Sequence, residues 1–582
     1  MANITTLPYE LIHEVSSQYL TSECLKSLRI AIPTPIISSA TASLLFHTVT
    51  FRLGNHQNSH EKLVIKSKYI KDLSRCPRYD DKAKHGSNKN NTSAGIFEFV
   101  KKVVVDVRHP FAVTEKALEH IAAERRRYRF RPQGELTEFE EIVGVSEADL
   151  FWNTVDEMFP KATRGGQLRV FRLLFSDVTP YEQIKRLLSL VCTPSASRSH
   201  HLSVSYTIRE SRNLEKFLSL ISDCNNLDIT FETWPAEELK EYEIDAIINT
   251  ISKCPDITGL GIFTRHREIC DEGAKKLWEF IFRFKRLDRL SIKTMAGAFP
   301  EAGGALEWNG LKTLELVMRD PWHGIGYTPL APLVAIEKDT SFIGDLLKSI
   351  NQKGVKLEKL TLNRYNTYIQ EGLMLQTGIT SLEIRGKLRV EIESYASSFW
   401  QDVIPILAPK LKSLRVYSTS ERGWSWYANE SNPAKLAIRK CQKLEELMIS
   451  SWRDGYRPVN YILDLITDLL LHNPRMRQLN MKPCPGNMRK KMGSTDTHFD
   501  IWTPEKSELP ELSEEREFEV IYDRKTDLQW IVGMDCLEKG EKSLAWDKYL
   551  QRWKLRYLQS GGREKNGMFC LDRYYDECRF DE

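Results

Sequence analysis

A recurring apolar triplet constrains the fold of this chain more than any other feature. The triplet has the form apolar-x-x-apolar-x-apolar, and its spacing is typical of a short β-strand that buries alternate residues. Triplets begin at Ile257 and again at seven later positions, separated by intervals of 22 to 46 residues: Leu287, Leu311, Leu357, Ile379, Leu411, Leu444 and Met476. Leu168-Phe171-Leu173 also fits, and the segments around Leu202/Val204 and Leu227/Ile229 have strand character without a clean register.

A second signal precedes several of these strands. Cys224, Cys254 and Cys441 each end a helix-like segment three residues before the next strand, and Asn473-Pro474 does the same. Apolar residues at helical spacing lie between strands, as at Leu277, Phe280 and Ile281. One strand and one helix cannot bury a core alone, so neighbouring copies must stack.

This pattern resembles the long, irregular leucine-rich repeats of the cysteine-containing kind, over roughly residues 160–485. The resemblance implies an α/β fold, a leucine-rich repeat solenoid with a curved parallel sheet and outer helices. The alternative is an ordinary α/β domain with leucine-rich strands.

Composition sets broad limits on function. The chain has 582 residues with a net charge of +4, which gives no general argument for a nucleic-acid or membrane partner. The sequence contains neither a long apolar run nor a secretory signal pattern, so no membrane partner is expected. Its 11 cysteines lack a C-x-x-C pair and predict reduced, buried thiols in a cytoplasmic or nuclear protein.

The N-terminal segment has a different pattern, with three short helical pieces expected over roughly residues 4–50. Its motif is Leu7-Pro8-x-Glu10-Leu11-Ile12-x-x-Val15, followed by Leu20, Leu25, Leu28-Arg29 and Leu44-Leu45-Phe46. This segment resembles an F-box, the small helical unit that binds the Skp-type adaptor of cullin–RING ubiquitin ligases. The resemblance implies an adaptor contact through Leu7, Pro8, Ile12, Val15, Leu25 and Leu28.

The segment departs from the F-box pattern after Arg29. Pro33 and Pro35 end the second helix early, where the family continues it. The alternative interpretation is a helical cap that covers the first repeat and binds nothing.

Aromatic and basic residues follow several predicted strands. Parallel strands end at one edge of a sheet, so these residues are expected to share one rim, suited to binding a target protein. The alternative is local packing of each aromatic over its own repeat. The candidate rim residues are Arg265, His266, Trp322, Arg364, Tyr365, Trp424, Trp426, Trp452, Arg453 and Tyr456.

Residues that alternate with the buried apolar positions are expected on the concave face of the sheet. They carry both signs of charge and few large apolar groups, which favours a protein partner over a phosphate backbone. They are Thr313, Glu315, Lys359, Thr361, Glu383, Arg385, Arg415, Tyr417, Glu446, Met448, Gln478 and Asn480.

The predicted organisation has four parts: an F-box-like domain (1–50), irregular first repeats with a polar loop (51–160), the solenoid (161–485), and a polar linker with a C-terminal capping helix (486–582). That helix is expected from Trp546, Tyr549, Leu550, Trp553 and Tyr557 on one face, and the alternative is a partner-binding helix.

No phosphate-binding loop, G-x-S-x-G or H-E-x-x-H motif is present, so neither a cofactor nor a metal is expected, and no catalytic residue is assigned. The resemblances together imply a non-catalytic substrate receptor of a Skp–cullin–F-box ubiquitin ligase, which binds a cullin through the adaptor and an unidentified target protein through the repeats. The alternative is an interaction scaffold whose F-box no longer binds the adaptor. A hydrolase or transferase on an α/β fold is a third possibility, which would need a deep pocket with clustered titratable groups.

Overall fold

The computed structural model describes the strand and helix segments of the chain in two compact units. One unit runs to Arg267 and the other from Glu268 to Arg563, so the boundary falls inside the range predicted as one solenoid. The described residues are 48–52, 102–106, 170–176, 181–191, 201–207, 214–222, 224–231, 239–264, 269–295, 299–300, 306–319, 330–384, 393–416, 424, 431–451, 465, 468–469, 471–483, 519–522 and 556–559.

The first unit is a parallel sheet whose described strands pair in chain order. Its strands are β1 (Thr48–Arg52), β2 (Lys102–Asp106), β3 (Val170–Ser176), β4 (His201–Thr207), β5 (Asn226–Phe231) and β6 (Gly259–Thr264). The described helices between them are α7 (Tyr181–Val191), α9 (Leu214–Leu218) and α10 (Glu241–Ser252).

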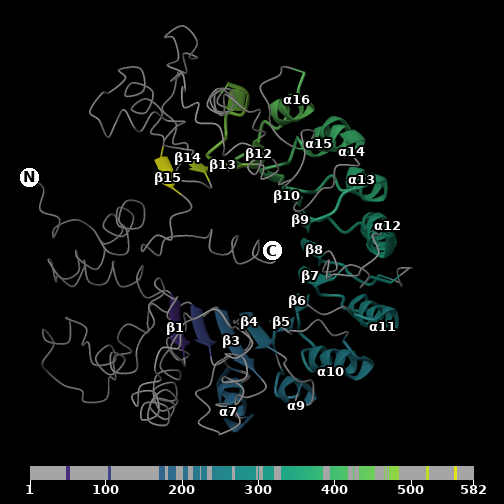
Figure 1. Cartoon of the computed structure of the whole chain (residues 1–582), viewed down its shortest axis with the longest axis vertical. Helices are drawn as coiled ribbons and strands as arrows, with labels where there is room; N and C mark the ends of the chain where they lie inside the picture. Colours follow the sequence, from purple (N-terminus) through teal and green to yellow (C-terminus); the bar gives the residue numbers. More distant parts are fainter. Residues whose placement is uncertain are drawn as a thin grey trace, which may run out of the picture. The chain divides into compact units, whose positions relative to one another are not determined.

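The second unit has the same α/β architecture, and its helices lie on one side of the sheet (Figure 1). The strands are β7 (Arg289–Met295), β8 (Thr313–Arg319), β9 (Lys359–Leu362), β10 (Ser381–Ile384), β11 (Ser413–Val416), β12 (Glu446–Ser451), β13 (Gln478–Pro483), β14 (Glu519–Tyr522) and β15 (Arg556–Gln559). The helices are α11 (Asp271–Ile281), α12 (Leu330–Gln352), α13 (Thr367–Met374), α14 (Glu393–Ser398), the π-helix η6 (Phe399–Val403), α15 (Ile404–Leu407) and α16 (Pro433–Arg439).

The apolar triplets predicted the strand register. In the second unit, the central residues of the triplets pair side by side in one continuous row: Leu290, Leu314, Leu360, Leu382, Leu414, Leu447 and Leu479. A parallel row contains Ile292, Leu316, Leu362, Ile384, Val416, Ile449 and Met481. Every residue of the first row is at most 1% exposed, so this row lies in the core beneath the helices.

A repeated hydrogen bond fixes each strand to the next. The Asp288 carbonyl oxygen accepts from the backbone N–H groups of both Lys312 and Thr313, each at 2.9 Å. The equivalent carbonyls of Lys312, Glu358, Thr380, Lys412 and Glu445 each accept two N–H groups of the following strand in the same way. The register therefore begins at the same backbone position at every step.

The predicted helix-ending residues form a shared turn. The backbone N–H of Leu444 donates to the Cys441 carbonyl at 3.1 Å, and Ile257 and Met476 donate in the same way to Cys254 and Asn473. Gln376 holds this position before Ile379, with a bond of 3.4 Å. Cys224, Cys254 and Cys441 are buried free thiols, as the sequence predicted.

Side chains in these turns also satisfy the carbonyls left without partners where a helix ends. Asn473 Nδ2 donates to the carbonyls of Ile438 and Cys441, both at 2.9 Å. Gln376 Nε2 donates to the Leu347 carbonyl at 2.7 Å, and Trp308 Nε1 to the Ile281 carbonyl at 3.0 Å.

The helices begin at capping residues that the sequence supplies. Asn366 Oδ1 accepts from the Ile369 N–H at 3.1 Å to start α13. Asn432 Oδ1 accepts from the Ala434 N–H at 2.8 Å to start α16, where Pro433 occupies the first turn. In the first unit, the Glu243 carboxylate accepts from the Lys240 N–H at 2.8 Å ahead of α10.

An aromatic cluster joins α11 to α12. Trp278 packs against Phe282, Phe299 and Phe342 with ring centroids 5.0–5.5 Å apart. Phe282 also contacts Trp308 at 5.6 Å. These side chains, all at most 2% exposed, fill the space between neighbouring strand–helix steps.

The C-terminal part corrects one prediction. Tyr557 was expected on a helix, but it lies in strand β15, where it pairs with Val520 of β14. Backbone pairing with a neighbouring strand overrides a local helical periodicity, which is only a weak preference. Strand β14 also begins inside the segment predicted as a linker, and the rest of the predicted capping helix lies outside the described residues.

Other predictions fall beyond the described part of the chain. They include the F-box-like segment with Leu7, Pro8, Ile12, Val15, Leu25 and Leu28. Among the helices that are described, none is long and apolar enough to cross a membrane.

Candidate binding surface

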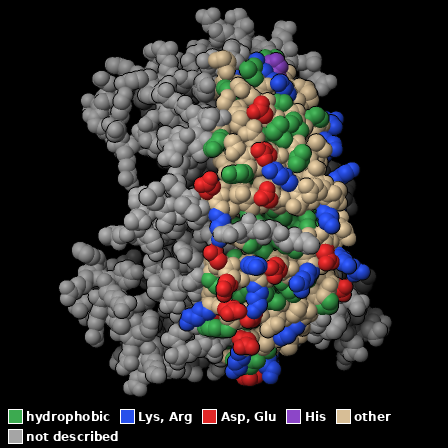
Figure 2. All heavy atoms as spheres, turned by 90° about the vertical axis from the view of Figure 1, so that its right-hand side faces the viewer, with side chains coloured by type: hydrophobic (Ala, Val, Ile, Leu, Met, Phe, Trp, Pro, Cys, Tyr) green, Lys and Arg blue, Asp and Glu red, His purple; other side chains and the backbone are tan. Residues whose placement is uncertain are grey.

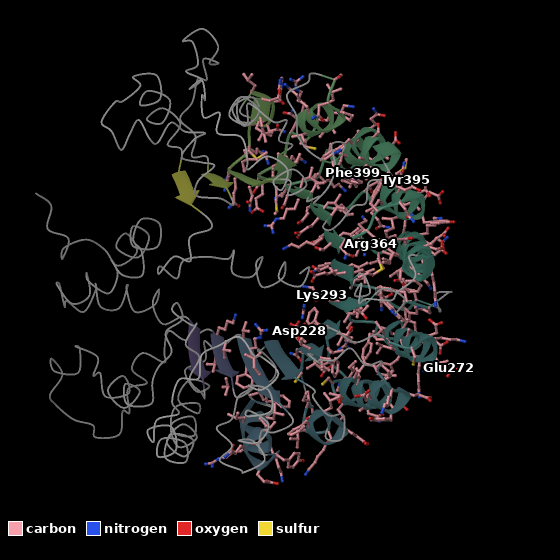
Figure 3. All side chains as sticks on the ribbon, in the orientation of Figure 1. Asp228, Glu272, Lys293, Arg364, Tyr395 and Phe399 are labelled. Carbon is pink, nitrogen blue, oxygen red and sulfur yellow. The ribbon has the colours of Figure 1, made fainter. Side chains whose placement is uncertain are left out.

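The sheet face turned away from the described helices of the second unit, here called the inner face, carries the predicted polar residues. Figure 3 shows Lys293 on this side, whereas Glu272 lies on the helix side. One row across strands β7 to β13 contains Ser291, Glu315, Thr361, Glu383, Arg415, Met448 and Asn480. The predicted Arg385 and Tyr417 lie outside the described residues.

Two charged groups on the inner face are held in place by neighbouring strands. Glu315 of β8 accepts from the Ser291 hydroxyl at 2.6 Å and pairs with Lys293 Nζ at 3.1 Å, both on β7. Glu446 of β12 accepts from the Ser413 hydroxyl at 3.1 Å and pairs with Arg415 at 3.3 Å.

These groups remain accessible on the inner face. The Lys293 and Glu315 side chains are 24% and 20% exposed, and those of Arg415 and Glu446 are 40% and 43% exposed. Pairs this accessible add only about 0–1 kcal/mol each to stability. Their main effect is to orient charged atoms of both signs on the inner face.

Three predicted rim residues are described, and all three are buried. Arg364 is 8% exposed, Tyr365 is 5% and Trp424 is 1%. The Tyr365 ring packs edge-on against Phe399 and Trp424, at 5.2 and 5.3 Å, and Phe399 contacts Trp424 at 5.2 Å. Tyr365 and Trp424 are therefore packed in the interior against residues of other strand–helix steps, and neither simply folds over its own repeat.

Burial also changes the chemistry of Tyr365. Removal from water raises the pKa of its phenol, and the Ser398 hydroxyl opposes this shift only in part. The hydroxyl stays protonated and uncharged at neutral pH.

The other rim candidates lie outside the described residues: Arg265, His266, Trp322, Trp426, Trp452, Arg453 and Tyr456.

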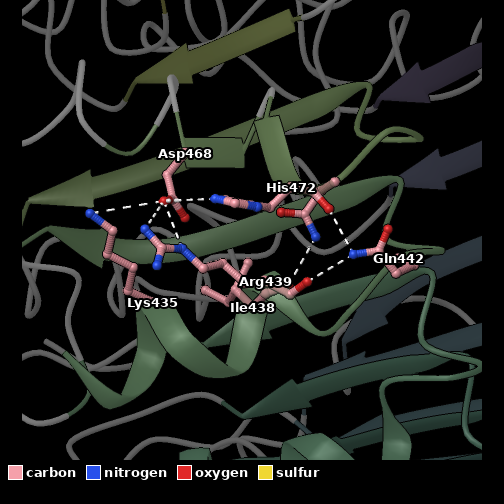
Figure 4. Close-up of polar contacts among 7 residues, drawn as sticks. Lys435, Ile438, Arg439, Gln442, Asp468 and His472 are labelled. Carbon is pink, nitrogen blue, oxygen red and sulfur yellow. Dashed lines mark hydrogen bonds and ion pairs between the residues drawn. The ribbon is translucent and has the colours of Figure 1, made fainter. Parts of the chain in front are cut away.

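A buried ionic cluster that the sequence did not predict joins α16 to the next step (Figure 4). Asp468 Oδ1 accepts from Arg439 Nε at 2.8 Å and from the same guanidinium through Nη2. Lys435 Nζ lies 3.9 Å away and His472 Nε2 3.8 Å away. The side chains of Lys435 and Asp468 are only 1% and 5% exposed, so this carboxylate balances basic groups in the interior.

The outer helices carry charges of both signs, as Figure 2 shows for the described residues. Lys338 of α12 pairs with Asp271 of α11 at 2.6 Å, and Lys348 of α12 pairs with Glu371 of α13 at 2.7 Å. The hydrogen bond from Lys348 to Glu371 raises the pKa of Lys348. These contacts link neighbouring helices across the outer face.

Possible sites for metals and nucleophiles give no further candidate. Within the segments that the structure covers, no three His, Cys, Asp or Glu side chains form a group that could hold a metal ion. Burial raises the pKa of the Cys441 thiol to about 12, so this cysteine is unsuited to nucleophilic chemistry at neutral pH.

Sequence reasoning missed two features of the second unit. One is the Asp468 cluster, because Arg439 and Lys435 lie 29 and 33 residues before Asp468 and the residues carry no motif. The other is a series of basic residues immediately before the triplets, including Lys356, Lys410 and Lys443. This series could have been recognised in the sequence, because each of these residues stands immediately before a triplet.

Comparisons with known proteins leave the family open. No protein-family model matches the chain, and no curated protein sequence matches it.

Proposed function

We propose that this chain is the substrate-recognition subunit of a Skp–cullin–F-box type ubiquitin ligase. The observation that carries the proposal is the order of two features: an F-box-like motif at residues 4–50, directly followed by a succession of strand-forming segments. The F-box docks on the adaptor and the following segments bind a target protein.

The second part of the proposal is that the strand–helix steps form a leucine-rich repeat solenoid. Pairing of the described strands in chain order within each unit supports this. The unbroken row from Leu290 to Leu479 and the repeated two-fold acceptance of N–H groups support it further. A solenoid with such uniform steps presents an extended face, of the kind used to bind proteins.

The mechanism is positional. A receptor that holds its target beside a ubiquitin-carrying enzyme raises the effective concentration of the reacting groups and needs no catalytic residue of its own. The paired charges at Lys293–Glu315 and Arg415–Glu446 are suited to this task, because they fix polar atoms on the inner face while leaving them accessible.

A second candidate function is favoured by a specific departure from the F-box pattern. Pro33 and Pro35 interrupt the second helix of the F-box-like segment. A chain that has lost adaptor binding would act as an interaction scaffold, with the same surfaces for partners and no link to a cullin.

Affinity purification with mass spectrometry separates these two functions. The test variant is Leu7→Asp with Ile12→Asp, and the matched control is Leu436→Asp with Leu471→Asp, because both control leucines are about half exposed. We expect the parent chain and the control to recover a Skp-type adaptor and a cullin, and the test variant to lose both. Partners without any adaptor from the parent chain would support the scaffold.

The target-binding surface is tested in the same preparation. Lys293→Glu with Arg415→Glu changes the inner face, and Trp426→Ala with Trp452→Ala changes the predicted rim. We expect captured targets to be lost from one of these variants while the adaptor is retained. An unchanged set of targets from both would contradict the proposed surfaces.

A further inference from the structure

The turns that lead from the helices into strands β7 to β13 form a strongly basic edge of the second unit. We define the basic edge as the exposed Lys and Arg residues of these turns: Arg283, Lys285, Arg286, Lys312, Lys353, Lys356, Lys410, Lys412, Lys440, Lys443, Arg475 and Arg477. The described residues of the same turns include four acidic ones, namely Asp288, Glu307, Glu358 and Glu445. The excess exceeds the net charge of +4 of the whole chain.

The charges are placed by the architecture rather than scattered. Among the seven triplets of strands β7 to β13, five are immediately preceded by a basic residue and two by glycine: Arg286, Gly310, Lys356, Gly378, Lys410, Lys443 and Arg475. The backbone bonds from Lys412 to Thr380 and from Arg477 to Glu445 hold successive turns side by side. Neighbouring strands lie about 4.8 Å apart, so the basic side chains recur along one line.

The two ion pairs described within the edge are weak. Lys285 lies 3.6 Å from Glu307 and Lys412 lies 3.9 Å from Glu445, and both pairs are well exposed to solvent. Exposed pairs at these distances are weak. A concentration of like charge on one edge attracts oppositely charged partners and accelerates their encounter.

The surroundings of the basic edge distinguish between classes of partner. Among its described turns the aromatic residues are Phe282 and Trp308, which are buried, and Phe284, which is half-buried, so exposed platforms for stacking nucleic-acid bases are lacking there. Leu375 is the one exposed large apolar side chain in these turns, too little for insertion into a membrane interface.

The carboxylates of the edge favour a protein partner over a phosphate backbone. Asp288, Glu358 and Glu445 occupy the same position of their turns as Lys312, Lys412 and Arg477. Interleaved carboxylates repel a uniform line of phosphates, whereas a protein segment with mainly acidic and some basic side chains matches both signs.

We propose that the basic edge is a docking surface for an acidic protein segment, distinct from the inner face. The surface acts mainly through long-range attraction and capture, so its binding is sensitive to salt. This inference does not depend on the ubiquitin ligase proposal, because the purified chain can be tested without an adaptor.

The test uses a fluorescent polyglutamate peptide and the purified full chain, with binding measured by fluorescence anisotropy. The variant Lys356→Glu/Lys410→Glu/Lys443→Glu reverses three charges on the edge. The control Lys185→Glu/Lys216→Glu/Lys275→Glu reverses three other exposed lysines and changes the net charge equally. A third variant replaces Lys356, Lys410 and Lys443 by Arg, which keeps the charge.

We expect the edge reversal to weaken peptide binding at least about tenfold, and the control and the arginine variant to retain it. Raising the ionic strength should weaken binding to the parent chain. An equal loss of peptide affinity in the edge and control variants would show that only the net charge of the chain matters, and this would overturn the proposal. Tighter binding of duplex DNA or of phosphatidylserine vesicles than of the peptide would overturn the assignment to a protein partner.

Discussion

The indole nitrogen of Trp308 donates a hydrogen bond of 3.0 Å to the carbonyl oxygen of Ile281, the last residue of α11. This bond joins one strand–helix step to the preceding one through a fully buried side chain. We expect Trp308→Phe to lower the free energy of unfolding by about 1–3 kcal/mol, because it leaves that carbonyl buried without this donor. Denaturant unfolding of the second unit measures the change, and a stability equal to the parent's would show that the bond contributes nothing.

The Asp468 carboxylate balances Lys435 and Arg439 in the interior. Asp468→Asn preserves the shape but removes the negative charge, so we expect a loss of stability of about 3–5 kcal/mol. The double variant Asp468→Leu/Lys435→Met removes both members of the most buried pair and should recover part of the loss. If the double variant were less stable than Asp468→Asn, the charge balance would not be the reason for the loss.

Trp424 lies among Tyr365 and Phe399 and is 1% exposed. Trp424→Ala should therefore lower stability by about 3–5 kcal/mol through the cavity that it leaves. Thermal unfolding and target capture should be measured on the same variant. Loss of captured targets without a change in the unfolding temperature would show that Trp424 contributes to target binding rather than to packing.

Cys441 is the thiol whose protection from reagents is most clearly expected. Its pKa of about 12 means that it stays a neutral thiol well above physiological pH, and its burial blocks access. At pH 8 we expect iodoacetamide to modify the partly exposed Cys270 before Cys441, and denaturation to remove the difference. Peptide mass spectrometry follows both sites, and equal rates in the folded chain would contradict the described burial.

Gly261 of the first unit leaves room for a neighbouring side chain. A Cβ atom at this position would lie 2.1 Å from Asp228 Oδ1 and 2.9 Å from the Phe263 ring. We expect Gly261→Ala to cost about 1–3 kcal/mol of stability because strand and side chain must shift. Gly354→Ala is a useful comparison, because its backbone φ of 71° is strained for alanine while a Cβ there meets no atom within 4 Å. Full stability of Gly261→Ala would show that Asp228 moves freely.

The strand core of the described regions was readable from the sequence, because each triplet places two apolar side chains on the same face of a strand. The row from Leu290 to Leu479 follows from that alternation alone. The turns were readable where cysteine or asparagine marked them. Trp308 and Gln376 occupy the equivalent position of two other turns and also donate to a helix carbonyl. Neither is a cysteine or an asparagine, so the sequence pattern did not reveal this equivalence.

The surface was less predictable for a physical reason. Whether Trp424 faces solvent depends on Tyr365 and Phe399, which are distant in sequence, and a local pattern does not contain that information. Tyr557 was assigned to a helix because periodicity takes no account of a strand partner such as Val520. The basic edge, by contrast, could be predicted from the sequence by reading the residue before each of these triplets.

The carbonyls of Lys312 and Glu358 each accept from the equivalent pair of N–H groups of the following strand, although the next triplets begin after intervals of 46 and 22 residues. The length of a connection therefore does not affect the hydrogen bonds that join its strand to the preceding one. Such a chain can lengthen or shorten one connection during evolution while its neighbours stay in place, so each connection is free to diversify toward a new partner independently of the rest.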